Sequence, residues 1–333
     1  MYGWSVGDWQ PLWAPVRVPG TVQVGGLSPD GKIFATAGPD GVIRLWDAAT
    51  GQLIRELKQG SYVRALRFSP SGDRILAGSN NGVLIVWDTQ TGSPLTTIQA
   101  HTADVISVEF GADGRRVVSS SYDYTARIWD ASTGRPLIPP LRHQGEAQHA
   151  TLSPNGRLIA TAARDGTARI WDAQTGQPTV DWMHHKDTVQ TVIFHPDGRR
   201  LFTRDHTGFR FWDVETGEPV TIHYQDPMSA GIAIDSPTLR DLLTRDGKHL
   251  FFGCSQDAAT LWDIPNAPPG APAWFPEFLE AVAGTRLSTA GEYLPVPVDN
   301  FLGLRERVRS LTTTDYYTKW VRWYLGQAET RPE

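Results

Sequence analysis

The stretch HTADVISVEFGADGRRVVSSSYDYTARIWDASTG, from His101 to Gly134, decides the fold of this chain. Apolar and polar residues alternate through VISVEF and TARIW, and RVVSS between them is rich in β-branched residues, so we predict three short strands. The turn GADG joins the first strand to the second. A tight turn at Tyr122–Asp123 opens the third strand, and Trp129-Asp130 closes it. The stretch therefore predicts a small antiparallel β unit.

Four side chains of this unit are spaced so that they could meet in its interior. A carboxylate in a tight turn can orient a histidine, and the histidine can reach a hydroxyl on the next strand. The hydroxyl can in turn reach an indole N–H, which satisfies each buried polar group. We expect this hydrogen-bonded chain to run in the order Asp123, His101, Ser119, Trp129.

The same unit recurs along the chain. Trp-Asp pairs begin at Trp46, Trp87, Trp129, Trp171, Trp212 and Trp262, at spacings of 41, 42, 42, 41 and 50 residues. A Thr-Gly turn follows the first five pairs, and turns of the SPDG type precede all six, beginning at Ser28, Ser69, Gly111, Ser153, His195 and Thr244. Over residues 1–264 this signature resembles the WD-repeat (WD40) β-propeller family. The resemblance implies an all-β propeller of about six WD-type blades, alone or within a larger array, with a short helical C-terminal appendage.

The family's hydrogen-bonded tetrad aligns with two complete sets of residues, which are His101, Ser119, Asp123, Trp129 in repeat three and His143, Thr161, Asp165, Trp171 in repeat four. Repeat one has Val18 in place of the histidine. In repeat two, Ala77 has no hydroxyl, so we expect no such chain there. In repeat five the alignment places Phe202 and His206 at the hydroxyl and carboxylate positions. We expect apolar packing to replace the network in these incomplete repeats.

Composition narrows the class of partner and compartment. The formal net charge is −5, which argues against nucleic-acid binding through a basic surface. No apolar run is long enough to span a membrane, and the start MYGWSVGDWQ lacks the regions of a signal peptide. The single cysteine, Cys254, cannot form an internal disulfide and reads as a small buried hydrophobe. We therefore expect a cytoplasmic protein.

The sequence predicts no catalytic residues, no metal site and no cofactor. The histidines at positions 101, 143 and 185 recur at the tetrad position, so we interpret them as structural. His184 and His195 lack the paired spacing of a zinc site. Asp, Ser and His recur once in every period of about 42 residues, which packing requires and a single active site does not. A glycine-rich phosphate loop and the protein-kinase motifs are absent from the sequence.

With no catalytic or metal site predicted, the exposed turns are the remaining candidates for function. Propeller partners commonly dock on the face that holds the turns between the second and third strands and the starts of the first strands. On that face the sequence places Tyr62, Tyr122 and Arg164, whose residue types are enriched at interface hot spots. We interpret them as candidate partner-binding residues. The alternative is that they are ordinary exposed loop residues without a binding role. An insertion near 225–238 is either a functional surface loop or a drifting insertion.

The two ends depart from the repeat. A proline-rich linker, 265–272, leads to a tail, 273–333, in which we expect helices that pack on the propeller. The tail pattern, which includes LEAVAG and D.Y..W.RW, resembles the tails of large bacterial WD-repeat proteins, some with a Ser/Thr kinase domain. At the other end, residues 11–17 read as an outer strand without a blade of its own. Either they pair with 257–263 and close a six-bladed ring, or the chain is part of a longer array.

The leading functional hypothesis is a non-catalytic protein-interaction scaffold, with unidentified protein partners, within a bacterial signalling protein. A propeller-type enzyme with a site at the central channel is one alternative. The other is a purely structural fragment of a longer repeat array.

Overall fold

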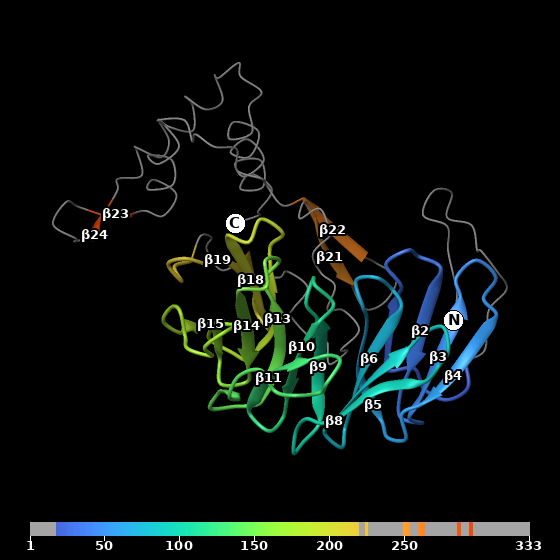
Figure 1. Ribbon diagram of the computed structural model, residues 1–333. Coiled ribbons are helices and arrows are strands. Elements are labelled where there is room, and N and C mark those ends of the chain that lie inside the picture. Colours follow the sequence, from blue (N-terminus) through green and yellow to red (C-terminus); the bar gives the residue numbers. More distant parts are fainter. Residues whose placement is uncertain are drawn as a thin grey trace. The chain divides into compact units, whose positions relative to one another are not determined.

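The structure is a computed structural model, and it describes residues 18–219 together with five short strands between 224 and 295 (Figure 1). Side chains are described for 18–219 only. These residues contain β-strands, turns and bends, and no helix occurs among them. No helix in the described part of the chain is long and apolar enough to cross a membrane. The chain divides into two compact units, Met1–Leu261 and Trp262–Glu333.

Five antiparallel sheets of four strands follow one another, and we call each sheet a blade. Blade one consists of β1 (Val24–Leu27), β2 (Ile33–Ala37), β3 (Val42–Asp47) and β4 (Leu53–Lys58). Blade two consists of β5 (Val63–Phe68), β6 (Arg74–Ser79), β7 (Val83–Asp88) and β8 (Pro94–Gln99). Blade three consists of β9 (Val105–Phe110), β10 (Arg116–Ser121), β11 (Thr125–Asp130) and β12 (Leu141–Arg142). Blade four consists of β13 (Ala147–Leu152), β14 (Leu158–Ala163), β15 (Thr167–Asp172) and β16 (Met183–His184). Blade five consists of β17 (Val189–Phe194), β18 (Arg200–Asp205), β19 (Gly208–Asp213) and β20 (Tyr224–Gln225).

Two further strand pairs are described. β21 (His249–Gly253) pairs with β22 (Ala259–Asp263), which ends at the sixth Trp-Asp pair. In the second unit, β23 (Thr285–Leu287) pairs with β24 (Tyr293–Pro295). The predicted helices of the tail, the insertion near 225–238 and the proposed pairing of residues 11–17 lie outside the described residues. The number of blades and the closure of a ring therefore stay predictions.

The first strands of successive blades, β1, β5, β9, β13 and β17, contact one another in chain order. This repeated contact between inner strands is the arrangement expected of propeller blades. The core lies between neighbouring blades: Trp129 of blade three packs in one cluster with Leu84 and Val86 of blade two. The repeat tryptophans at 87, 171 and 212 pack in the same way against the preceding blade.

Local chemistry explains the turns. Asp130 Oδ1 accepts hydrogen bonds from the backbone N–H groups of Ser132 and Thr133 and from both of their hydroxyls. The hydroxyl of Ser132 and the other donors lower the pKa of Asp130 to about 2. Gly134 then takes a φ of 70°, which glycine adopts without a Cβ clash. The Asp-x-x-Thr-Gly sequence thus builds its own turn, and the chain repeats it in all five blades.

The outer strands differ between blades. β4 and β8 are six residues long, whereas β12 and β16 have two residues each and are preceded by an isolated bridge at Pro136 or Pro178. Proline lacks the N–H that a ladder requires, and blade three has prolines at 136, 139 and 140. Pro139 and Pro140 cannot donate to the ladder, and pairing resumes only at Leu141 of β12.

Candidate interaction surface

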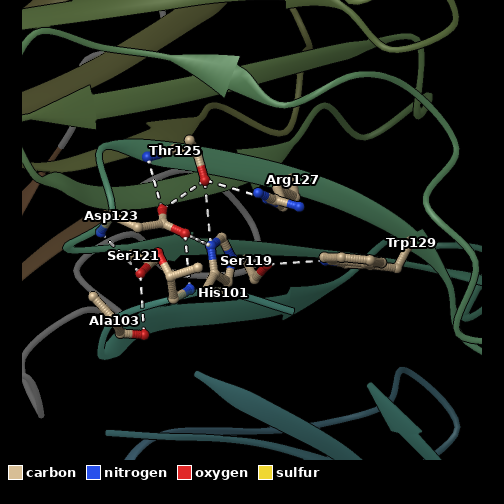
Figure 2. Close-up of polar contacts among 9 residues, drawn as sticks. His101, Ala103, Ser119, Ser121, Asp123, Thr125, Arg127 and Trp129 are labelled. Atoms are coloured by element: carbon tan, nitrogen blue, oxygen red, sulfur yellow. Dashed lines mark hydrogen bonds and ion pairs between the residues drawn. The ribbon is translucent and has the colours of Figure 1, made fainter. Parts of the chain in front are cut away.

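A hydrogen-bonded relay runs through the interior of blade three (Figure 2). Trp129 Nε1 donates to Ser119 Oγ at 3.0 Å, and Ser119 Oγ lies 2.8 Å from His101 Nε2. His101 Nδ1 lies 2.9 Å from Asp123 Oδ2. Because the carboxylate only accepts, Nδ1 carries the proton and Nε2 accepts from the serine hydroxyl. Each group therefore donates to the next, from the indole to the carboxylate.

Asp123 also fastens the surface turn. Its Oδ2 accepts from the backbone N–H of Thr102 at 3.2 Å, and its Oδ1 accepts from the hydroxyl of Thr125 at 2.6 Å. Burial on its own would raise the pKa of Asp123, but the hydrogen bonds from His101 and Thr125 outweigh it and lower this pKa well below its usual range. Sequence reasoning missed Thr125, although the threonines at 167 and 207 stand two residues after their carboxylates in the same way.

Blade four repeats the relay with threonine as the hydroxyl. Trp171 Nε1 donates to Thr161 Oγ1 at 2.8 Å, and Thr161 Oγ1 lies 2.7 Å from His143 Nε2. The last link is longer, at 3.5 Å between His143 Nδ1 and Asp165 Oδ2. Burial opposes a low pKa at Asp165, and hydrogen bonds from His143 and Thr167 overcome it and lower this pKa.

Blade five corrects the sequence alignment. Trp212 Nε1 donates to Thr203 Oγ1 at 2.7 Å, and Thr203 Oγ1 lies 2.9 Å from His185 Nε2. His185 Nδ1 lies 2.9 Å from Asp205 Oδ2. The prediction that Phe202 and His206 replace the polar pair is wrong, because the turn before β19 is one residue shorter and counting back from Trp212 shifts the register.

Blade two corrects a second expectation. The four-membered chain is absent, as Ala77 requires, yet apolar packing does not replace it. Trp87 Nε1 donates directly to Gln59 Oε1 at 3.0 Å, and Gln59 Nε2 donates to Ser79 Oγ at 2.7 Å. A glutamine amide carries an acceptor and a donor on one long side chain, so it spans the place of the histidine and the hydroxyl.

In blade one, Trp46 Nε1 donates to Thr36 Oγ1 at 2.8 Å. The blade has no histidine at this position, and the carboxylate of Asp40 pairs with Arg44 Nη1 at 2.7 Å instead. Arg44 Nε also pairs with Glu56 of the outer strand at 3.0 Å.

The relay has the carboxylate, imidazole and hydroxyl order of a hydrolase triad. Its hydroxyl, however, is not accessible to a substrate. Ser119 is 0% exposed, and its oxygen already accepts from Trp129. Three blades contain the same arrangement, and in each the hydroxyl is buried. Within residues 18–219, no group of three or more His, Cys, Asp or Glu side chains could hold a metal ion. The relay therefore holds the blade together and positions its turns.

In blades two to four, a backbone hydrogen bond joins the turn between the second and third strands to the start of the first strand. The backbone N–H of Tyr122 donates to the carbonyl of Asp104 at 3.1 Å, and that of Arg164 donates to the carbonyl of Glu146 at 2.9 Å. In blade two, Asn80 N–H donates to the carbonyl of Tyr62 at 2.9 Å. Each turn between the second and third strands is thus joined to the residue that begins the first strand, and together they form one surface per blade.

Tyr62 takes part in a bridge between blades. The guanidinium of Arg64 lies 4.8 Å from the centre of the Tyr62 ring, and Arg64 Nη2 pairs with Asp104 Oδ2 at 2.8 Å. A cation over an aromatic face is attractive, so the ring is held against its arginine. The surface of blade two is therefore continuous with that of blade three.

Tyr124 is the residue of this surface that sequence reasoning missed. It is 50% exposed and has a φ of 68°, whereas the turns of equal length in blades one, two and four have glycine at this point, namely Gly41, Gly82 and Gly166. A non-glycine residue in this region is strained, and such strain concentrates at functional sites. The sequence signal was a tyrosine in a place where other repeats have Asp-Gly or Asn-Gly.

Arg164 is held by an ion pair within its own blade. Its side chain is 64% exposed, and its Nη1 pairs with Glu146 Oε2 at 3.1 Å. The hydrogen bond and the charge of Glu146 raise the pKa of Arg164, and the charges of Tyr122 and Tyr124 contribute less. We call Tyr122, Tyr124, Glu146 and Arg164 the tyrosine–arginine patch. It combines two aromatic rings with an ion pair on rigid turns.

Comparison with known proteins agrees with the geometry of the blades. The model of the WD domain, G-beta repeat family matches residues 18–47, 51–88, 92–130 and 142–172. These four segments are WD40 repeats. Each matched segment ends at the Trp-Asp pair of blades one to four, and the fifth blade has the same relay beyond the matched range.

Curated relatives match a short stretch. The small ribosomal subunit protein RACK1 of Glycine max is 50% identical over 52 residues, which is 16% of each chain. Cross-pathway control WD-repeat protein 2 of Flammulina velutipes is 40% identical over the same length and shares. Among solved structures, the computationally designed Ika8 protein has a TM-score of 0.64 and 25% identity, over 78% of this chain and 76% of that one. The matches to curated relatives thus span about a sixth of their length.

Proposed function

We propose that this chain is a non-catalytic protein-interaction scaffold whose docking surface is the tyrosine–arginine patch, extended by Tyr62. The observation that carries the proposal is Tyr124, an exposed aromatic residue at a left-handed turn position where three other blades have glycine. Strain of this kind costs about 1–3 kcal/mol, and retaining it favours a role for the ring itself. Tyrosine and arginine are also the residue types enriched at the centres of protein interfaces.

The WD40 repeats support the same function, because proteins built from them commonly present turns to protein partners. The relays support it physically: each fixes its turn to the core, so the patch is preorganised and loses little entropy when a partner binds. An enzyme of the hydrolase-triad type would need an accessible nucleophile, and the Ser119 and Thr161 hydroxyls are buried.

Partner capture with matched variants tests the proposal. Proximity labelling with the full chain, followed by quantitative mass spectrometry, should identify proteins that are lost with Tyr122→Ala and Arg164→Ala. The same proteins should be retained with Ile54→Ala, which changes an exposed residue of β4 in blade one. A partner set that is unchanged by every patch variant would contradict the proposal.

Tyr124→Gly separates binding from folding. The substitution installs the residue that blades one, two and four have at this turn, so the free energy of unfolding should rise by about 0.5–1 kcal/mol as strain is relieved. Partner binding should fall at the same time. A variant that is less stable than the wild type would show that Tyr124 serves packing and not docking.

We further propose that the scaffold acts within a larger signalling protein of the bacterial type. This rests on the pattern of residues 273–333, with LEAVAG and D.Y..W.RW, and on nothing in the described blades. Genomic sequence on both sides of the coding region tests it: a kinase domain or further repeats in frame would support the proposal, and stop codons on both sides would contradict it.

A further inference from the structure

A pocket of about 380 Å³ opens at the outer edge of blade three, on a part of the molecule that the docking turns do not use. It is lined by Arg127 of β11 and by the segment Pro136–Pro140, which leads to β12. Leu137 in this segment is 44% exposed. The volume lies at the lower end of the range of about 300–1,000 Å³ that is typical of ligand sites.

Blade four has the same two elements in the same register. Thr125 pairs with Arg142 in blade three, and Thr167 pairs with His184 in blade four. The isolated bridges fall at Pro136 and Pro178, again 42 residues apart. Leu137 N–H donates to Ile128 O at 3.0 Å, and Thr179 N–H donates to Ile170 O at 3.0 Å. Residues of the two outer segments therefore correspond one to one.

This correspondence matches Pro140 of blade three with Trp182 of blade four. The Trp182 ring lies directly against the guanidinium of Arg169, which corresponds to Arg127. Arg169 also lies 5.0 Å from the ring of Trp171, so its cation is held between two indoles. Trp182 also lies nearly parallel to the ring of His184, with ring centres 6.5 Å apart. In blade four an indole from the outer segment covers the arginine.

In blade three the arginine has no such cover. Arg127 lies 5.9 Å from the Trp129 ring, and its Nε donates to Thr125 Oγ1 at 3.3 Å. Within residues 18–219 no acidic side chain pairs with it, in contrast to Arg44, which has Asp40 and Glu56. Pro140 is too short to reach the guanidinium as Trp182 does. The result is a cationic face beside a wall of proline and aliphatic side chains.

We propose that this pocket is a receptor for an aromatic side chain, tryptophan first, carried by an extended segment of a partner protein. The ring would lie on the guanidinium of Arg127 and against Pro136–Pro140, as Trp182 lies on Arg169. A ring face attracts a cation, and the prolines and the leucine offer apolar surface to the rest of the ring. The site is a second binding surface, independent of the tyrosine–arginine patch.

The probe is the capped peptide PTVDWMH, a copy of residues 178–184, observed by saturation-transfer NMR with the full chain. We expect saturable binding to the wild type. Replacing the tryptophan of the peptide with cyclohexylalanine should weaken binding, because the saturated ring has no π face. Absence of saturable binding, or equal binding of the two peptides, would overturn the proposal.

Variants of the chain locate the site. Pro140→Trp supplies the residue of blade four and should fill the pocket in cis, with a loss of at least about tenfold in affinity. Arg127→Ile, which copies Ile85 of blade two, should weaken binding about two- to fivefold. Leu137→Ala should weaken it too, whereas Leu95→Ala, the corresponding exposed residue of blade two, should not. Unchanged binding to folded Pro140→Trp or Arg127→Ile would overturn the assignment.

The reciprocal change tests the analogy directly. Trp182→Ala should open a matching pocket at Arg169, so the peptide should bind at two sites in place of one. Free indole should also raise the melting temperature of this variant more than that of the wild type. If indole raises both equally, or neither, the outer edge of blade four does not behave as an indole receptor and the inference fails.

Discussion

Blades two and three bury the same indole N–H in different ways, and the difference separates packing from turn control. In blade two Gln59 accepts from Trp87 and donates to Ser79, and the Ser79 hydroxyl donates to the carbonyl of Val83 at 3.2 Å, across the turn from β6 to β7. In blade three a chain of hydrogen bonds runs outward from Trp129 to Asp123. Asp123 also accepts a hydrogen bond from the backbone of Thr102. Satisfying the indole needs one acceptor, whereas tying the turn to the backbone that precedes the first strand, as Asp123 does at Thr102, needs the longer relay.

The largest effect should be common to both blades. Trp87→Ala and Trp129→Ala each remove a buried indole that packs against the preceding blade, so each should lower the free energy of unfolding by about 3–5 kcal/mol. Urea unfolding of the full chain measures the two losses. If one variant loses less than half as much unfolding free energy as the other, the two blades differ in packing and not only in their hydrogen bonds.

The second effect should divide the blades. Asp123→Ala leaves the buried Nδ1–H of His101 without its acceptor and should cost about 1–3 kcal/mol. Asn81→Ala in blade two removes an exposed hydrogen bond to Ser61 and should change stability by less than about 0.5 kcal/mol. Similar losses in the two variants, measured by urea unfolding, would show that the relay does not reach the turn.

The third effect is a dependence on pH. Because the folded-state pKa of Asp123 is lowered, its contribution is fully present above the unfolded pKa of about 3.9 and is lost as the pH falls below it. The cost of Asp123→Ala should therefore be smaller at pH 3 than at pH 7. Gln59→Ala removes no charge, so its cost should be the same at both. Urea unfolding at a series of pH values checks this, and parallel profiles for the two variants would refute it.

The smallest effect is a coupling energy. Gln59→His and Ala77→Ser should each destabilise blade two, because each places one buried polar group without its partner. Together they install the histidine and hydroxyl of blade three, so the double variant should be more stable than the sum of the single changes predicts, by at least about 0.5 kcal/mol. An additive double-mutant cycle would mean that the two blades differ in backbone geometry as well as in side chains.

The sequence by itself determined the strands and turns of the blades. The predicted strands of the His101–Gly134 stretch are found as β9, β10 and β11. The alternation of apolar and polar residues, the Asp-x-x-Thr-Gly turn and glycine at positive φ each act over a few residues. The sequence of each repeat is therefore enough to determine its strands and turns. The relay of blade three also follows from spacing, because its turn has the length of the other repeats.

Only the tertiary structure decided which side chains meet across strands. A turn that is shorter by one residue moved the polar pair of blade five to Thr203 and Asp205, and the length of one glutamine replaced two residues in blade two. The ring of Trp182 covers Arg169, whereas Pro140 leaves Arg127 beside an open pocket. Strand register, the reach of a side chain and the path of an outer segment all depend on contacts between residues far apart in the chain. The sequence of a single repeat does not contain those contacts.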